Sequence, residues 1–185
     1  MTKPLHHRIW TSLRHRWADG TGARRVLPAE AMERLRQRVA ASEQRHTGQI
    51  RICVESSLPR SYLWRHVRRR VPMGTLAHQR ALMAFSKLRV WDTECNNGVL
   101  IYLLVAEHAI DLIADRGVAH LVEPSIWDAM VKNLGEALRQ ESFEEGLTRA
   151  LEEVSAVLVK HFPRNPDPAH PGNHNNELPD TPVVR

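Results

Sequence analysis

Carboxylate and amide side chains gather around one apolar segment of the chain, residues 99–106. A polar cluster precedes that segment, and a further carboxylate follows residues 110–114. Oxygen ligands of these two kinds suit a hard cation such as calcium or magnesium. The alternative is that they only cap turns at strand ends, since their spacing matches no loop with a fixed ligand pattern. The candidate metal ligands are Asp92, Glu94, Asn97 and Asp115, joined by Glu43 and His46.

Two strands are expected to position these residues. Residues 99–106 are all apolar, a run too short for a membrane helix and typical of a strand buried on both faces. Glu107-His108 can form a tight turn, after which residues 110–115 alternate with the period of a second strand. Strands joined by so short a turn pair antiparallel. Asn97 and Asp115 are therefore expected on one rim of a sheet.

A third strand is predicted over residues 49–55, which also alternate. A helix over residues 73–88 follows it, and the strand–helix–strand order favours a right-handed crossover between parallel strands. The start of this strand then lies on the same rim, which brings Glu43 and His46 near the other candidate ligands. Polar residues at the opposite rim are expected on the surface: Glu55, Glu107 and His108.

Helices are predicted around these strands. Pro28 suits the first turn of one helix. Capping boxes predict two more, at Ser125-Ile126-Trp127-Asp128 and at Ser142-Phe143-Glu144-Glu145. The sequence therefore predicts an α/β fold with a small mixed sheet flanked by helices.

Length and composition fit a soluble globular protein. The 185 residues suit one domain with extensions, and 42% hydrophobic and 25% charged residues are ordinary for that class. Cys53 and Cys95 have no metal-ligand spacing and suggest no disulfide scaffold. No apolar run reaches the roughly 18 residues of a membrane span, and the N-terminus lacks the apolar core of a signal peptide. A cytoplasmic protein is expected, with peripheral contact to the inner membrane left open.

The chain has a net charge of +5, and its positive charge is concentrated in two segments. Residues 3–17 have the pattern of a basic amphipathic helix, either packed on its own domain or resting on anionic lipid. Residues 60–72 combine arginines with Tyr62 and Trp64, which could bind phosphates, although such runs are commonly solvated faces. No recognised nucleic-acid motif accompanies them, so nucleic acid is the less favoured partner. The candidate anion-binding residues are Arg65, Arg68, Arg69 and Arg70.

No motif of nucleophilic catalysis is present. The sequence lacks a Gly-x-Ser-x-Gly elbow, a cysteine beside a histidine in a recognised pattern and a glycine-rich phosphate loop after a strand. A phosphatase built on this chain would have to use a metal and carboxylates to activate water and to neutralise a developing oxyanion. Only the rim from Asp92 to Asp115 could supply those groups.

Several short motifs run along nearly the whole chain. They are Arg24-Arg25-Val26-Leu27-Pro28, Glu43-x-x-His46-x-Gly48-x-Ile50, Trp91-Asp92-Thr93-Glu94, Asn97-Gly98-Val99-Leu100-Ile101-Tyr102, Ala114-Asp115-Arg116-Gly117-Val118, His161-Phe162-Pro163 and Asn176-Glu177-Leu178-Pro179-Asp180. Together they resemble the TPM domain, in its bacterial soluble type. The resemblance implies a Rossmann-like α/β/α sandwich over residues 27–163. It would lie between a basic N-terminal arm, residues 1–26, and a flexible polar Pro- and Asn-rich tail, residues 164–185.

The same resemblance sets the functional expectations. In plant thylakoid relatives the family is associated with acid phosphatase activity and calcium, and elsewhere it is a membrane-tethered or accessory module. This chain has Asn96 where many relatives place an aspartate before Asn-Gly, which removes one potential ligand. The leading hypothesis is an accessory or interaction module that has no established catalysis. It would bind a divalent cation, calcium or magnesium, and an unidentified protein partner. The alternatives are a metal-dependent acid phosphatase-like hydrolase and a protein that binds an anionic membrane or nucleic acid through its basic patches.

Overall fold

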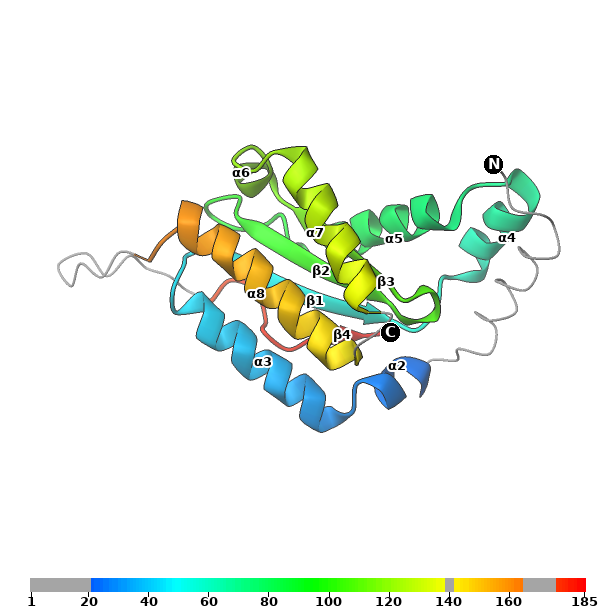
Figure 1. Cartoon of the computed structure of the whole chain (residues 1–185), viewed down its shortest axis with the longest axis horizontal. Coiled ribbons are helices and arrows are strands. Elements are labelled where there is room, and N and C mark those ends of the chain that lie inside the picture. The colour runs from blue at the N-terminus through cyan, green and yellow to red at the C-terminus, as the bar shows by residue number, and fades with distance from the viewer. Residues whose placement is uncertain (1–20, 139–141, 165–175) are drawn as a thin grey trace.

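Four strands form one mixed sheet at the centre of Figure 1, a computed structural model that describes residues 21–138, 142–164 and 176–185. Their order across the sheet is β3-β2-β1-β4. The helix predicted over residues 3–17 lies outside the described residues. The strands are β1 (Gln49–Glu55), β2 (Gly98–Leu104), β3 (Ala109–Ala114) and β4 (Val183–Val184).

The pairing of the first three strands confirms the prediction. β1 and β2 are parallel, with Gln49 opposite Gly98, and β2 and β3 are antiparallel, with Val99 opposite Ala114. β2 ends at Leu104, two residues earlier than predicted, because a short 3₁₀ turn, η1 (Val105–Glu107), begins there. His108, which has a φ of 46°, completes the connection to β3.

Helices cover both faces of the sheet, as Figure 1 shows. One face carries α3 (Ala29–Glu43), α7 (Pro124–Ala137) and α8 (Phe143–His161), and the other carries α4 (Arg60–Arg69) and α5 (Met73–Lys87). Two short helices, α2 (Thr21–Val26) and α6 (Arg116–Ala119), complete the described chain. The fold is therefore α/β, with a four-stranded mixed sheet flanked by helices.

Each face of the sheet has its own hydrophobic core. On the first face Ile52 and Ile101 pack with leucines of α3 and α8. On the second, Leu100 and Tyr102 pack with the small residues of α5, which let that helix lie close to the sheet. Every residue of β1 and β2 is buried, because helices cover both faces of these two strands. None of the helices in the described ranges combines the length and apolar composition that crossing a bilayer requires.

One of the two predicted capping boxes is present. The Ser142 side chain accepts a hydrogen bond from Glu145 N, and the Glu145 carboxylate accepts one from Ser142 N, at the start of α8. The box predicted at Ser125 is wrong, because α7 begins at Pro124 and its N-cap is Glu123, two residues before Ser125. Proline is favoured at the first helical position, which places Ser125 inside the helix.

Residues 176–185, predicted to lie in a flexible tail, are packed against β1 instead. β4 pairs parallel with β1, and the Leu178 side chain is buried. Gln49 Oε1 accepts hydrogen bonds from the backbone N–H groups of Glu177 and Leu178, at 2.9 and 3.1 Å. The Arg51 guanidinium donates to the backbone oxygens of Pro179 and Thr181. Backbone contacts of this kind leave no pattern in a short polar sequence, so the sequence did not reveal them.

Candidate functional site

The rim predicted from strand pairing is formed by the start of β1, the start of β2 and the end of β3. Gln49 N donates to Asn97 O at 3.3 Å, and Asp115 N donates to Gly98 O at 2.8 Å. These two bonds extend the sheet just beyond the paired strands. Residues 46–49, 93–98 and 115–117 therefore meet at one edge of the sheet.

Asp115 lies at this rim between a strand and a helix. It caps α6: its Oδ1 accepts a hydrogen bond from Arg116 N at 2.7 Å. The residue is only 7% exposed, and its other carboxylate oxygen, Oδ2, is buried without a hydrogen-bond donor among the described residues. Asp115 thus caps α6 through Oδ1, as the turn-cap alternative expects, whereas Oδ2 keeps no donor among the described residues.

Asn97 presents a second unpaired oxygen at the same rim. Its N–H donates to Thr93 Oγ1 at 3.1 Å, and its side-chain Nδ2 donates to Thr47 O at 3.1 Å. The side chain is 1% exposed, and Oδ1 has no donor among the described residues. A buried acceptor left unpaired costs about 1–3 kcal/mol, so these two oxygens are a costly feature of the fold.

The loop before β2 is held tightly against the start of α6. Gly117 N donates to Asn96 O at 2.9 Å. A Cβ at Gly117 would lie 2.6 Å from Asn96 O and 2.8 Å from Cys95 O, so only glycine permits this approach. Asn96 has a left-handed backbone, with a φ of 51°, and its side-chain oxygen accepts from Arg116 at 3.2 Å. The loop geometry thus fixes where Asn97 lies relative to Asp115.

Asp92 and Glu94, the other two candidate ligands on this loop, are exposed. The Asp92 carboxylate forms an ion pair with Arg89 three residues earlier. Glu94 lies next to the C-terminal segment, where its N–H donates to the Glu177 carboxylate at 2.9 Å. The structure therefore does not bury these two carboxylates beside Asn97 and Asp115.

Glu43 lines a pocket of about 100 Å³ next to the rim, together with Asp180 of the C-terminal segment. Its Oε1 accepts a hydrogen bond from Ile50 N at 2.9 Å. Burial raises the pKa of the Glu43 carboxyl from 4.5 to about 7, and the negative charge of Asp180 adds to the rise, although the bond from Ile50 N opposes it. Glu43 is thus a carboxyl that changes protonation near neutral pH.

His46 is fully buried in a hydrogen-bond network between α3 and α8. Its Nδ1 donates to Gly48 O at 3.0 Å, and its Nε2 lies 2.9 Å from Ser42 Oγ, which in turn lies 2.8 Å from Ser155 Oγ. Burial lowers the pKa of His46 from 6.5 to about 4, so the ring is neutral at pH 7. Because both ring nitrogens are engaged within the protein, His46 holds the chain before β1 in place.

Glu43→Gln tests the half-buried carboxyl through the pH dependence of stability. The folded-state pKa lies above the unfolded value, so protonation of Glu43 favours folding, and this contribution is lost as the pH rises from about 4.5 to about 7. The glutamine stays neutral and keeps the oxygen that accepts from Ile50 N. We expect the variant to be about 1–2 kcal/mol more stable than the wild type at pH 8 and nearly equal to it below pH ~4.5. Urea unfolding across this pH range measures the difference, and the exposed Glu94→Gln is the control; parallel curves for all three proteins would contradict the prediction.

Within residues 21–138, 142–164 and 176–185, no three histidine, cysteine, aspartate or glutamate side chains come together as a metal-binding group. The six candidate ligands are divided: Asn97 and Asp115 are buried at the rim, Glu43 and His46 lie beside the neighbouring pocket, and the other two are exposed. A cation at the rim would therefore depend on Asp115, the Asn97 amide, backbone oxygens and water.

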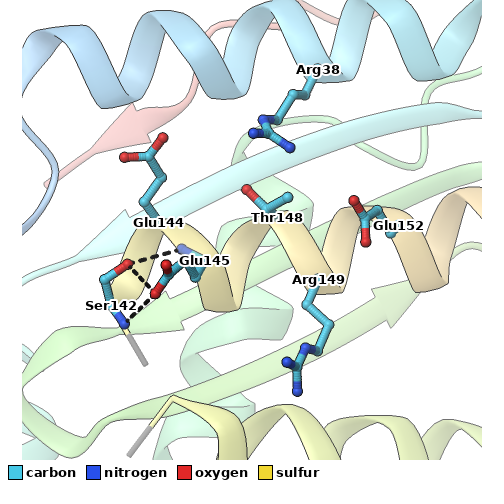
Figure 2. Close-up of a pocket in the computed structure, with 7 residues that line it drawn as sticks. All are labelled: Arg38, Ser142, Glu144, Glu145, Thr148, Arg149 and Glu152. Atoms are coloured by element: carbon cyan, nitrogen blue, oxygen red, sulfur yellow. Dashed lines mark hydrogen bonds between the residues drawn. The ribbon is translucent and has the colours of Figure 1, made fainter. Parts of the chain in front are cut away.

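A larger polar pocket of about 580 Å³ lies between α3 and the first half of α8 (Figure 2). Two of the side chains that line it, Ser142 and Glu145, form the capping box, and Glu144 forms an ion pair with Arg34. Three of its polar groups thus have structural roles at the start of α8. None of the candidate site residues predicted from the sequence lines this pocket.

The candidate anion-binding arginines, Arg65, Arg68, Arg69 and Arg70, lie on α4 and at its C-terminus. α4 follows the end of β1, at the opposite end of the sheet from the rim (Figure 1). The structure thus separates the predicted anion-binding residues from the predicted metal ligands.

Sequence reasoning missed one buried polar cluster. Glu55, expected on the surface, is 5% exposed, and its carboxylate accepts two hydrogen bonds from Arg80 and one from Tyr102. Burial, and then the neighbouring Glu55 carboxylate, raise the pKa of Tyr102, which therefore stays a hydrogen-bond donor. No sequence signal pointed to this cluster, because β1 becomes a middle strand only through its pairing with β4, and a buried charged side chain then needs a partner from the covering helix.

Comparison with known proteins agrees with the fold. The model of the TPM domain matches residues 22–157. No curated protein matches the chain. Among solved structures, the chain is similar to the NMR structure of the BA42 protein from the psychrophilic bacterium Bizionia argentinensis, with a TM-score of 0.67 and 25% sequence identity. The match covers 85% of this chain and 94% of that protein. The chain therefore belongs to the TPM domain family.

Proposed function

We propose that this chain is an accessory TPM module that binds one divalent cation, calcium or magnesium, at the rim. The observation that carries the proposal is the pair of buried, unpaired oxygens, Asn97 Oδ1 and Asp115 Oδ2. A hard cation takes oxygen ligands of these two kinds, and an oxygen that binds it no longer carries the cost of being buried without a partner. Both are acceptors, so a cation suits them better than an anion does.

The donor set predicts modest affinity. Asp115 would supply the negative charge and Asn97 a neutral oxygen, and fewer charged ligands give weaker calcium binding. Asn96, which stands where many relatives have an aspartate, bonds to Arg116 instead of adding a carboxylate. We therefore expect the cation to act at the millimolar concentrations typical of weak calcium sites.

An accessory role accounts for the groups beside the rim better than catalysis does. Hydrolysis at a metal needs a base or a nucleophile with access to the reacting atom. His46 is fully buried with both ring nitrogens engaged, and the Asp92 carboxylate is paired with Arg89. These groups support folding rather than turnover.

A metal-dependent phosphatase-like hydrolase is the second candidate, and one observation favours it. Glu43 has a pKa of about 7 and lines a pocket, which is the combination expected of a general acid. In that case phosphomonoester hydrolysis would need the cation, and it would be lost in both Asp115→Asn and Glu43→Gln.

Cation-dependent melting tests the proposal. Calcium or magnesium at about 100 times its dissociation constant should stabilise the wild type by about 2.7 kcal/mol, because a ligand that binds only the folded state shifts the unfolding equilibrium. Asp115→Asn should abolish this shift, since it removes the charge. The apo-protein should remain folded, because an asparagine side chain is also a favoured N-cap for α6.

Asp92→Asn is the matched control, since it removes an exposed carboxylate from the same loop. Its response to the cation should equal that of the wild type. No shift in the wild type would mean that no cation binds the folded protein, and an equal shift in Asp115→Asn would mean that the cation binds away from Asp115; either result would overturn the proposal. Robust cation-dependent phosphomonoester turnover would replace the accessory role with the hydrolase.

A further inference from the structure

α4 presents a compact basic surface, which we call the α4 patch: Arg60, Trp64, Arg68, Arg69 and Arg70, all exposed. The segment 60–70 contains five arginines and no aspartate or glutamate. Such a concentration of one charge raises the local potential and attracts anionic surfaces.

Among the described residues, the patch arginines have no carboxylate partner of the kind that other arginines have. Arg34, Arg80 and Arg89 each form an ion pair with a glutamate or aspartate. Within the described residues, no ion pair involves Arg60, Arg68, Arg69 or Arg70. In the part of the chain that the structure describes, no carboxylate therefore competes with an external anion for their guanidinium donors.

Trp64 is the apolar centre of the patch, and its side chain is 52% exposed. The guanidinium carbons of Arg68 and Arg69 each lie 5.6 Å from the centre of its ring. These distances are within the range of cation–π attraction, which holds the two arginines next to the indole. An exposed indole flanked by cations combines the two features that place a side chain at a membrane–water interface.

The opposite face of α4 fixes the patch to the domain. Leu63 and His66 are buried, and His66 Nδ1 donates to Val71 O at 2.8 Å. Arg70 ends the helix in a left-handed conformation, with a φ of 56°. The patch is therefore presented on a packed helix rather than on a free loop.

We propose that the α4 patch docks the protein on an anionic phospholipid surface. The Trp64 indole enters the interface, and the guanidinium groups donate to lipid phosphates, which Arg recognises through paired N–H donors. A lipid surface fits better than nucleic acid, because a single exposed indole among arginines suits a membrane–water interface and no recognised nucleic-acid motif accompanies the patch. The proposal is independent of cation binding, since α4 lies at the other end of the sheet (Figure 1).

Co-sedimentation of the full chain with vesicles tests the proposal. Binding is expected to phosphatidylcholine vesicles that contain phosphatidylserine and not to phosphatidylcholine alone, and it should fall between about 50 and 300 mM salt. Each arginine near an anionic surface contributes about fivefold in binding, so Arg68→Ser/Arg69→Ser should weaken binding about thirtyfold. Trp64→Ser should weaken it at both salt concentrations, because the interfacial contribution of the indole is less sensitive to screening.

Arg36→Ser/Arg89→Ser is the matched control, since it removes the same charge from arginines that face carboxylates. It should bind vesicles nearly as well as the wild type, and melting curves check that every variant is folded. Equal loss in this control would show that net charge alone drives binding. Binding that survives in Arg68→Ser/Arg69→Ser, or α4-dependent binding to duplex DNA or single-stranded RNA without binding to vesicles, would overturn the proposal.

Discussion

Arg80→Ala is expected to lower the free energy of unfolding by about 3–5 kcal/mol, the cost of leaving a buried charge without its partner. Arg80 Nε and Nη2 donate to the two oxygens of Glu55 at 2.7 and 2.5 Å, and the side chains are 13% and 7% exposed. Tyr102 Oη donates to the Glu55 carboxylate at 2.7 Å. In Arg80→Ala, Tyr102 would be the one donor that remains of these three hydrogen bonds. Urea unfolding near neutral pH measures the loss.

Arg34→Ala provides the matched control for this ion pair. Arg34 binds Glu144 through the same two nitrogens, both at 2.7 Å, but the two side chains are 52% and 24% exposed. An exposed pair contributes about 0–1 kcal/mol, because water solvates both charges after the pair is broken. Since the geometry is alike and the burial differs, equal losses in the two variants would contradict the assignment of Arg80 to a buried, stabilising pair.

Gly98→Ala is the second substitution with a large expected effect, a loss of about 3 kcal/mol or more. A Cβ at Gly98 would lie 2.0 Å from Val90 O, and a backbone oxygen cannot move aside as a flexible side chain can. Gly98 begins β2 and its own oxygen accepts from Asp115 N, so a shift of this backbone would also disturb the rim. Thermal unfolding measures the loss of stability, and cation-dependent melting shows whether the rim is still formed.

Gly135→Ala is the corresponding control within the same chain. Gly135 lies in α7, and a Cβ there would meet nothing within 4 Å. Alanine is favoured over glycine in a helix by about 0.5–1 kcal/mol, so this variant should be more stable than the wild type. If both substitutions changed stability by the same amount, close packing at Gly98 would not be the reason why glycine is required there.

Much of the fold could be predicted from the sequence, because it depends on local pattern and on short connections. The apolar run before Glu107, the tight turn and the alternation after it determine an antiparallel pair, and the helix after Glu55 determines a parallel one. These pairings place Asn97 and Asp115 on one rim. The box at Ser142 was also predictable, whereas the box at Ser125 failed because Pro124 takes the first helical position.

The sequence by itself determined β1, β2 and β3, their pairing and the shared rim, and only the tertiary structure decided that β4 joins the sheet and which polar groups are buried at the rim. Asp92 and Asp115 are the same residue type on the same rim, yet one pairs with Arg89 in solvent and the other keeps a buried, unpaired oxygen. Glu55 is buried because a helix covers its strand and supplies Arg80, and β4 is ordered by contacts with Gln49 and Arg51, far away in the chain. Burial depends on what packs against a residue from distant segments, and that information is absent from local periodicity.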